Sequence, residues 1–309
     1  MRHRSAIKLS LGLAAAIGLS LTTLVVYRPI ASAAQPGAAQ LVAAYRWTHP
    51  AKWFGGFSAL SMSPDGRQMT VISDRATIVT ADIQRGADLM QAITSVTPTK
   101  AHKLRASDGA ILRGRIVDAE GLAVAQDGTL FISFEGVSRV ARHRKGDSRA
   151  EVLPRPKAFR RLPLNKALEA LAIDKRGHLY TLPERALTKS GDIPVWRWNG
   201  SRWDRPFVLP SRGNFLPVGA DFGPDGRFYL LERNFGFIGF RSRLRRWNVV
   251  GDHISGEVTL LETGLGLHDN LEGVSIWRDQ SGALRATMVS DDNFKSLQRT
   301  ELVEYRLPE

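Results

Sequence analysis

Apolar and polar positions alternate in the same way in five separate stretches of the chain. In each stretch an apolar run is followed by a glycine-containing turn and a second apolar run; the stretches are 55–75, 118–136, 168–185, 218–233 and 271–294. Two short apolar runs that flank such a turn are typical of a β-hairpin. The pattern therefore predicts five antiparallel hairpins, with turn glycines at positions 66, 128, 177, 226 and 282.

Further strands are expected between these hairpins. The runs 195–198 and 202–209 flank Asn199-Gly200, the runs 240–249 and 257–261 form another pair, and 302–307 is a last strand. The turn glycines recur every 49 to 62 residues, which is close to the length of a four-stranded propeller blade. We therefore predict an all-β fold, a single β-propeller of five to six four-stranded blades. A sixth blade would come from the long first interval or from pairing of the two termini.

The N-terminal residues have the pattern of a secretory signal. Arg2, Arg4 and Lys8 precede an apolar run at 9–26 and the small residues Ala31-Ser32-Ala33, which predicts a signal peptide over 1–33 that is cleaved after Ala33. The apolar run is also long enough to remain as a membrane anchor. Residues 34–44 are predicted to be a tether and 45–309 the propeller domain. The expected location is periplasmic or secreted, alternatively anchored to the membrane by residues 9–26.

Composition excludes several kinds of chemistry and favours one kind of partner. The chain has no cysteine, which excludes disulfides, thiol catalysis and zinc held by cysteine. Its net charge of +13 favours a small anionic substrate. The arginine-rich segments 139–161 and 241–246 match no nucleic-acid reader motif, so no nucleic acid partner is expected. The sequence gives no indication of the oligomeric state.

Acidic residues stand at the start and at the end of the hairpins. Both ends of a hairpin lie opposite its turn, so in a ring of blades these acids should gather on one face. Carboxylates crowded together repel one another unless a cation neutralises them, and Ca²⁺ prefers oxygen ligands in loose geometry. The predicted calcium ligands are Asp74, Glu120, Glu135, Glu169, Glu184, Glu232, Glu272, Asp291 and Asp292.

Some of these residues are also candidates for chemistry. The candidate catalytic residues are Glu120, Glu169, Glu272 and Asp291, and the candidates for binding an anionic substrate are Arg75, Arg185, Arg233 and Asn293. His268, four residues before Glu272, is either a general base or a solvated loop residue. In the alternative interpretation, each acid binds backbone N–H groups or an arginine at a junction between blades and closes the ring without any chemistry.

The succession of motifs resembles a known family. The motifs are GFSAL…ISDR within 56–75, DAEGLA…SFEG within 118–136, LEALA…LPER within 168–185, DF…DGRFYLLER within 221–233 and LEGVSIW…VSDDNF within 271–294. They resemble the phytase-like family, often described as "esterase-like activity of phytase". The resemblance implies a propeller-like fold, exported bacterial proteins and hydrolysis of phosphate or other esters. The chain lacks the Asp-Asp-Pro-Ala run of established propeller phytases and the Arg-His-Gly motif of histidine phosphatases.

Together, the residues and the resemblance predict an exported, calcium-assisted hydrolase of phosphate or other esters. Two alternatives stay open. One is a non-catalytic propeller that binds a cell-envelope ligand or a partner protein. The other is a sugar-lactone hydrolase, whose site chemistry would be similar.

Overall fold

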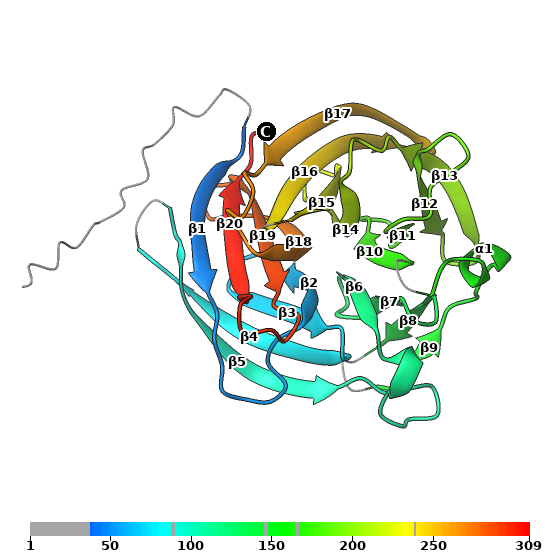
Figure 1. Ribbon diagram of the computed structural model, residues 1–309, viewed down its shortest axis with the longest axis horizontal. Coiled ribbons are helices and arrows are strands. Elements are labelled where there is room, and N and C mark those ends of the chain that lie inside the picture. Colours follow the sequence, from blue (N-terminus) through cyan, green and yellow to red (C-terminus); the bar gives the residue numbers. More distant parts are fainter. Residues whose placement is uncertain (1–37, 88–89, 145–147, 165–166, 238) are drawn as a thin grey trace, which may run out of the picture. The chain divides into compact units, whose positions relative to one another are not determined.

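Five antiparallel sheets of four strands each form a ring in the part of the chain that the structure describes (Figure 1). The computed structural model describes residues 38–309 except 88–89, 145–147, 165–166 and 238. These residues belong to one compact unit. The predicted all-β propeller is confirmed, with five blades. The predicted signal segment 1–33 lies outside the described residues.

Each of the first four blades is built from four strands that follow one another in the sequence. Blade 1 contains β2 (Phe57–Met62), β3 (Gln68–Ser73), β4 (Thr77–Arg85) and β5 (Ile93–Lys103). Blade 2 contains β6 (Ala119–Val124), β7 (Leu130–Phe134), β8 (Arg139–His143) and β9 (Glu151–Val152). Blade 3 contains β10 (Leu168–Ile173), β11 (Leu179–Pro183), β12 (Ile193–Trp198) and β13 (Trp203–Leu209). Blade 4 contains β14 (Leu216–Phe222), β15 (Phe228–Gly236), β16 (Gly239–Val250) and β17 (His253–Glu262).

Blade 5 closes the ring by joining the two ends of the described chain. It contains β18 (Asn270–Arg278), β19 (Leu284–Asp291) and β20 (Glu301–Arg306), and β1 (Gln40–Arg46) pairs with β20 as its outermost strand (Figure 1). Pairing of the two ends therefore completes the fifth blade and does not supply a sixth. Residues 40–44, predicted as tether, are strand instead. Backbone pairing with the edge of β20 orders them, although their side chains are exposed or half-buried.

The five predicted hairpins are confirmed, together with the predicted strands between them. Their turn glycines, at 66, 128, 177, 226 and 282, all have φ between +67° and +83°, a region that glycine adopts without steric cost. Each N–H donates to the carbonyl three residues earlier, at 2.8–2.9 Å. The sequence pattern did not reveal β1, β4, β5, β8 or β9. Two short helices, η1 (Gly114–Ile116) and α1 (Lys157–Arg160), lie in connections.

The first strand of each blade lies innermost, and each of these strands contacts the first strands of the two neighbouring blades. Small residues allow this close approach. A Cβ on Gly121 would lie 2.7 Å from the carbonyl oxygen of Glu169, and one on Gly219 would lie 2.4 Å from that of Glu272. Glycines at or directly after the leading position of the hairpin motifs therefore have a packing role at the axis.

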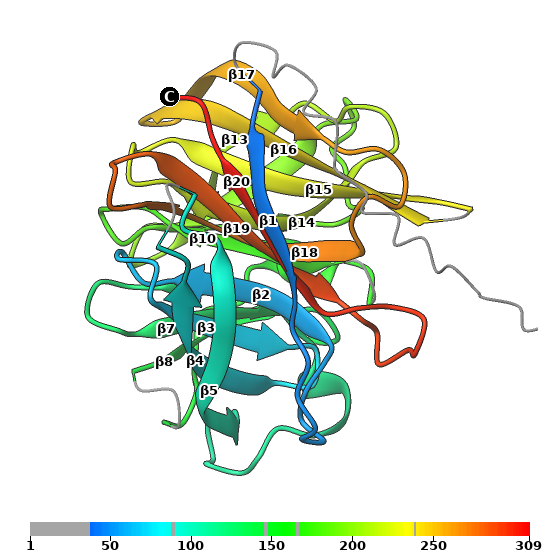
Figure 2. The same ribbon diagram turned by 90° about the vertical axis from the view of Figure 1, so that its left-hand side faces the viewer.

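The core lies between neighbouring sheets. Val71 and Val79 of blade 1, for example, pack in one cluster with Trp277 and Val289 of blade 5. Figure 2 shows the sheets from the side, with the β15–β16 hairpin extending beyond the strands beside it. No helix in the described part of the chain is long and apolar enough to cross a membrane.

Candidate functional site

Each innermost strand has a β-bulge at an equivalent position near its start. The register of its pairing with the second strand of the blade shifts at Ser58, at Glu120-Gly121, at Glu169, at Val218 and at Glu272. A bulge changes the direction of a side chain relative to the regular strand. Three of the five bulges carry a glutamate, so the predicted leading acids Glu120, Glu169 and Glu272 occupy equivalent positions around the axis.

The second strand of each blade ends at an equivalent position, which we call the closing position. In blades 1 to 3 the closing residue donates its backbone N–H to the residue two before the bulge at 2.8–2.9 Å, and these closing residues are Asp74, Glu135 and Glu184. In blade 5 it is Asp291, which pairs with Asn270. In blade 4 it is Arg233, which pairs with Leu216. Four predicted closing acids are therefore on the expected face.

The predicted position of Glu232 on this face is wrong. Glu232 pairs with Pro217, one residue further along β14 than the partner of Arg233. Because neighbouring residues of a strand project from opposite faces of its sheet, Glu232 points away from the acids at the axis. Its side chain is fully buried and accepts hydrogen bonds from Arg243 Nε at 2.8 Å and from Arg245 Nε and Nη2 at 2.7 and 2.5 Å. Both carboxylate oxygens are thus used inside blade 4, so we omit Glu232 from the proposed ligands.

We call the leading acids Glu120, Glu169 and Glu272 and the closing acids Asp74, Glu135, Glu184 and Asp291 together the acid cluster. One further acid lies in it. Carboxylate oxygens of Asp118, Glu120 and Glu135 all lie within 4.8 Å of one another, and the three side chains are half-buried. Asp118 precedes the bulge of blade 2 by two residues and was not among the predicted ligands. The signal was present in the sequence, because Asp118 opens the DAEGLA motif. This spacing would allow the three oxygens to contact one metal ion.

Burial and mutual repulsion favour the neutral forms of the clustered acids. Burial raises the pKa of Glu120 and Glu169 well above the usual value, and neighbouring carboxylates add to the effect. Burial also raises the pKa of Glu272, that of Asp74 to about 6 and that of Asp291 to about 8. A cation would lower the pKa of the acids that it contacts, because it stabilises their ionised forms.

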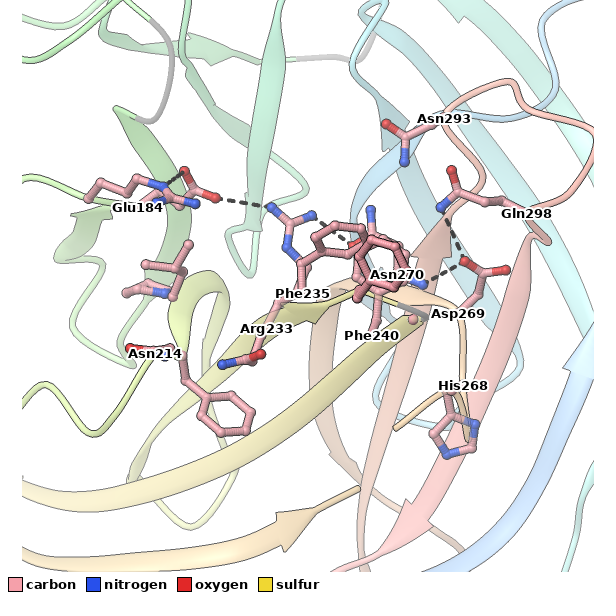
Figure 3. Close-up of a pocket in the computed structure, with 18 of the residues that line it drawn as sticks. Glu184, Asn214, Arg233, Phe235, Phe240, His268, Asp269, Asn270, Asn293 and Gln298 are labelled. Carbon is pink, nitrogen blue, oxygen red and sulfur yellow. Dashed lines mark hydrogen bonds and ion pairs between the residues drawn. The ribbon is translucent and has the colours of Figure 1, made fainter. Parts of the chain in front are cut away.

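Arg233 partly neutralises the cluster and links three blades. Its Nη1 donates to Asn270 Oδ1 at 2.7 Å and to Glu272 Oε1, and its Nη2 donates to Glu184 Oε1 at 3.0 Å (Figure 3). Arg185 Nε also contacts Glu184, at 3.2 Å, and about half of the Arg185 side chain is exposed. Both Nη groups of Arg233 therefore already donate hydrogen bonds within the protein, whereas Arg185 has exposed surface that a ligand could contact.

The remaining predicted residues lie nearby, at the junction of blades 5 and 1. Asp292 Oδ1 accepts the backbone N–H of Gly56 at 2.9 Å, and its Oδ2 accepts the hydroxyl of Thr300 at 2.9 Å. Arg75 is exposed and lies over the ring of Phe294. Asn293 is also exposed, and its backbone N–H donates to Asp291 Oδ1 at 2.6 Å. Asp292 thus has a structural role that involves both of its carboxylate oxygens.

One carboxylate oxygen of Asp74 makes no hydrogen bond, in contrast to the oxygens of Asp292. Its Oδ1 is buried and has no hydrogen-bond partner within the described part of the chain. An unsatisfied buried carboxylate oxygen is costly. Protonation would remove the charge but not supply a partner, whereas a cation that binds Oδ1 would do both.

A pocket of about 1250 Å³ adjoins the cluster at Glu184, Arg233 and Asn270 (Figure 3). Residues of blades 3, 4 and 5 line it. Its apolar lining includes Leu187, Phe215, Phe235, Phe240 and Leu297, and its cationic lining includes Arg185, Lys295 and Arg299. Neither these apolar residues nor this pocket was predicted from the sequence.

His268 lines the same pocket but is poorly suited to act as a base. It is buried, and its Nε2 lies 2.6 Å from the hydroxyl of Tyr305. Burial, together with the charge of Arg299, lowers its pKa to about 4. His268 is therefore neutral at pH 7 and is neither the solvated loop residue nor a well-poised general base.

Solved structures with a similar arrangement of strands are distant relatives at most. A selenomethionine-substituted virginiamycin B lyase from Staphylococcus aureus is 13% identical, with a TM-score of 0.41 over 88% of this chain and 75% of that one. A PQQ-bound aldose sugar dehydrogenase from Streptomyces coelicolor is 14% identical, with a TM-score of 0.44 over 87% and 99%. A glucose dehydrogenase is 13% identical, with a TM-score of 0.45 over 86% and 99%. At these identities we carry no activity over from them.

Sequence comparison gives a more specific result. Curated protein sequences give no match. The family model described as "Phytase-like: Esterase-like activity of phytase" matches residues 52–294, which include all five hairpins and every residue of the acid cluster. The match confirms the resemblance noted from the motifs, and the chain belongs to the phytase-like family.

Proposed function

We propose that this protein is an exported hydrolase of phosphate or other esters and that it works with a calcium ion held by the acid cluster. The observation that carries the proposal is the convergence of Asp118, Glu120 and Glu135, whose oxygens lie within 4.8 Å of one another. Carboxylates without cysteine or histidine are the donor set that a hard cation such as Ca²⁺ prefers. The unsatisfied Oδ1 of Asp74 supports the same conclusion.

Asp118, Glu120 and Glu135 would hold the ion, with Glu169 and Asp74 as further candidate ligands. When bound, calcium would supply a Lewis acid that polarises a phosphoryl or carbonyl oxygen and lowers the pKa of water. The protein itself supplies groups for proton transfer. Asp291, with its pKa raised to about 8 by burial, keeps its proton at pH 7 and could donate it to a leaving group.

Orientation of an anionic substrate would depend on cations beside the cluster. Arg185 is half-exposed and lies on the pocket wall with Lys295. A guanidinium can bind a carboxylate or phosphate through two parallel hydrogen bonds. We propose Arg185 as the principal residue of this kind, because the donors of Arg233 are already engaged with Glu184, Glu272 and Asn270.

A second candidate function follows from the contacts between blades. Glu135 Oε1 accepts the backbone N–H of Ala167 in the next blade at 2.9 Å, and Asp292 and Gly56 make a similar link between blades 5 and 1. These contacts favour a role of the acids in ring closure, as expected for a non-catalytic propeller that binds a ligand or a partner of the cell envelope.

An activity screen separates the two candidates. Purified protein would be assayed against p-nitrophenyl esters, p-nitrophenyl phosphate and a set of sugar lactones, with calcium and with a chelator. The proposal expects calcium-dependent hydrolysis of an ester or phosphoester that is abolished in Glu120→Gln. Hydrolysis of lactones alone would select the lactonase alternative. If no substrate reacts, and Glu120→Gln only lowers the melting temperature, the acids serve ring closure.

A further inference from the structure

The β15–β16 hairpin is longer than its counterparts in the other blades. In blades 1, 2, 3 and 5 the second strand ends at the closing position or one residue before it. In blade 4 the pairing continues beyond Arg233 through Asn234↔Arg241, Phe235↔Phe240 and Gly236↔Gly239. Four blades close without these pairs, so the ring does not require the extension.

The extension places aromatic side chains beside the acid cluster. Arg233 and Phe235 are two residues apart on β15 and therefore project from the same face. Phe235 lies opposite Phe240, with 5.1 Å between ring centroids, and both rings line the pocket (Figure 3). The apolar extension of the hairpin thus continues the wall that begins at the Arg233–Glu184 ion pair.

Other connections add apolar residues to the same pocket. We call Leu187, Phe235, Phe237 and Leu297 the apolar rim; all four line the pocket. Their exposed fractions are 49%, 69%, 101% and 95%, respectively. They come from the β11–β12 connection, the β15–β16 hairpin and the β19–β20 connection. Large apolar side chains gathered and exposed around one pocket usually mark a binding site.

The charges around the rim favour a ligand that is also anionic. The lining contains Arg185, Lys295 and Arg299. Its two acids are already paired: Glu184 with Arg233, and Asp269 with the backbone N–H of Arg299 at 2.8 Å. The pocket therefore offers an apolar wall and the exposed cations Arg185 and Lys295, and it meets the carboxylate cluster at Glu184.

We infer that the apolar rim selects substrates with an apolar acyl or aryl group and holds them so that their ester or phosphoester group lies at the acid cluster. This inference rests on the proposed hydrolase function and names its substrate class. A small and fully polar ester would leave the rim exposed to water, whereas an eight-carbon acyl chain would cover part of it. Each buried methylene contributes roughly 0.8 kcal/mol, so chain length should have a large effect on kcat/KM.

The test compares p-nitrophenyl octanoate with p-nitrophenyl acetate. The ratio of their kcat/KM values should favour octanoate in the wild type and should fall about tenfold, or about 1.4 kcal/mol, in Phe235→Ser and in Leu297→Ser. Val250→Ser is the matched control, because Val250 is 74% exposed at the other end of β16. A ratio that is the same in all four proteins would overturn the inference and leave ester hydrolysis intact.

A binding measurement keeps the inference testable if no ester is hydrolysed. Anilinonaphthalene sulfonate carries both an aromatic body and an anionic group, and its fluorescence reports binding. Weaker binding in Phe235→Ser than in Val250→Ser would support the rim as the site for apolar anions even though the proposed hydrolase function had failed. Equal binding in both variants would overturn it. So would a wild-type dimer that Phe235→Ser converts to a monomer with unchanged dye binding, because the rim would then be a subunit contact.

Discussion

Glu232 and Arg233 are neighbours in the sequence but belong to different parts of the propeller. Glu232 is buried within blade 4 and accepts hydrogen bonds from Arg243 and Arg245, whereas Arg233 points to the axis and donates to Glu184, Glu272 and Asn270. The Glu-Arg pair looks like the closing motif of blade 3, Glu184-Arg185, but is shifted by one residue relative to its strand. Blade 4 therefore presents a cation where the other blades present an acid.

Replacing Glu232 should destabilise the fold without affecting the cluster. Glu232→Gln leaves Arg243 and Arg245 buried without their shared carboxylate, and breaking a buried ion pair costs about 3–5 kcal/mol. Urea unfolding in the presence of a chelator would measure this loss. Calcium affinity should be that of the wild type. A loss of affinity as large as in Glu120→Gln would place Glu232 among the ligands after all.

Replacing Arg233 should change both the stability of the metal-free protein and the stability that calcium adds. Arg233→Met removes the cation that lies between Glu184 and Glu272, so the metal-free protein should lose stability, by roughly 3 kcal/mol if the pair behaves as a typical buried one. Calcium should restore more stability to this variant than to the wild type, because the positive charge of the guanidinium no longer repels the ion. Thermal melts with and without calcium would show the difference. An equal calcium-dependent gain in both proteins would contradict the assignment.

The fold could be predicted from the sequence because its signals are local. Each hairpin is marked by apolar runs around a glycine such as Gly128 or Gly226, whose positive φ is required by the turn itself. Two of the strands that were missed lack such a local signal. β1 is ordered by the edge of β20, far away in the sequence, and β9 has only two residues, both exposed.

Close packing at the axis predicts that a larger residue at Gly219 destabilises the fold. In Gly219→Ala the added Cβ would lie 2.4 Å from the carbonyl oxygen of Glu272, so the inner strands of blades 4 and 5 would have to separate. Overpacking of this kind costs about 1–3 kcal/mol. Gly264→Ala is the matched control, because its Cβ would meet no atom within 4 Å. Equal melting temperatures for the two variants would show that the strands are not in tight contact.

The stability of the metal-free protein should fall as pH rises. Burial raises the pKa of Asp74 to about 6, of Asp221 to about 7 and of Asp291 to about 8, each from an ordinary value of 3.8. At these three groups the folded state therefore binds more protons than the unfolded state between about pH 4 and about pH 8, and their sum exceeds the opposite contribution of His268, whose pKa is lowered to about 4. Over that interval these groups reduce the free energy of unfolding with each increase in pH.

Melting temperatures measured in chelator at several pH values would test this dependence. Asp291→Asn cannot ionise, so its melting temperature should fall less steeply, while Asp82→Asn, a change at an exposed position on β4, should behave like the wild type. Saturating calcium should make the fall shallower, because the ion keeps the acids that contact it ionised. A wild-type melting temperature that rises over the same interval without calcium would contradict the raised pKa values.

The candidate site was only partly predictable, for physical reasons. Repetition of the motif placed Glu120, Glu169, Glu272 and the closing acids on one face, because register is conserved from hairpin to hairpin. The exception was blade 4, where a shift of one residue exchanged Glu232 for Arg233. The pocket walls could not be predicted, since Leu187 and Leu297 come from connections whose paths no periodic pattern specifies, and Phe235 lies in an extension of β15 that the other blades lack.

Calcium titration of the chelator-treated protein tests the central claim most directly. Isothermal titration calorimetry should show saturable binding in the wild type, an affinity about tenfold weaker or worse in Glu120→Gln, and an unchanged affinity in Glu232→Gln. Absence of binding heat in the wild type, or an affinity that Glu120→Gln leaves unchanged, would contradict the claim that the carboxylates around the axis form a metal site.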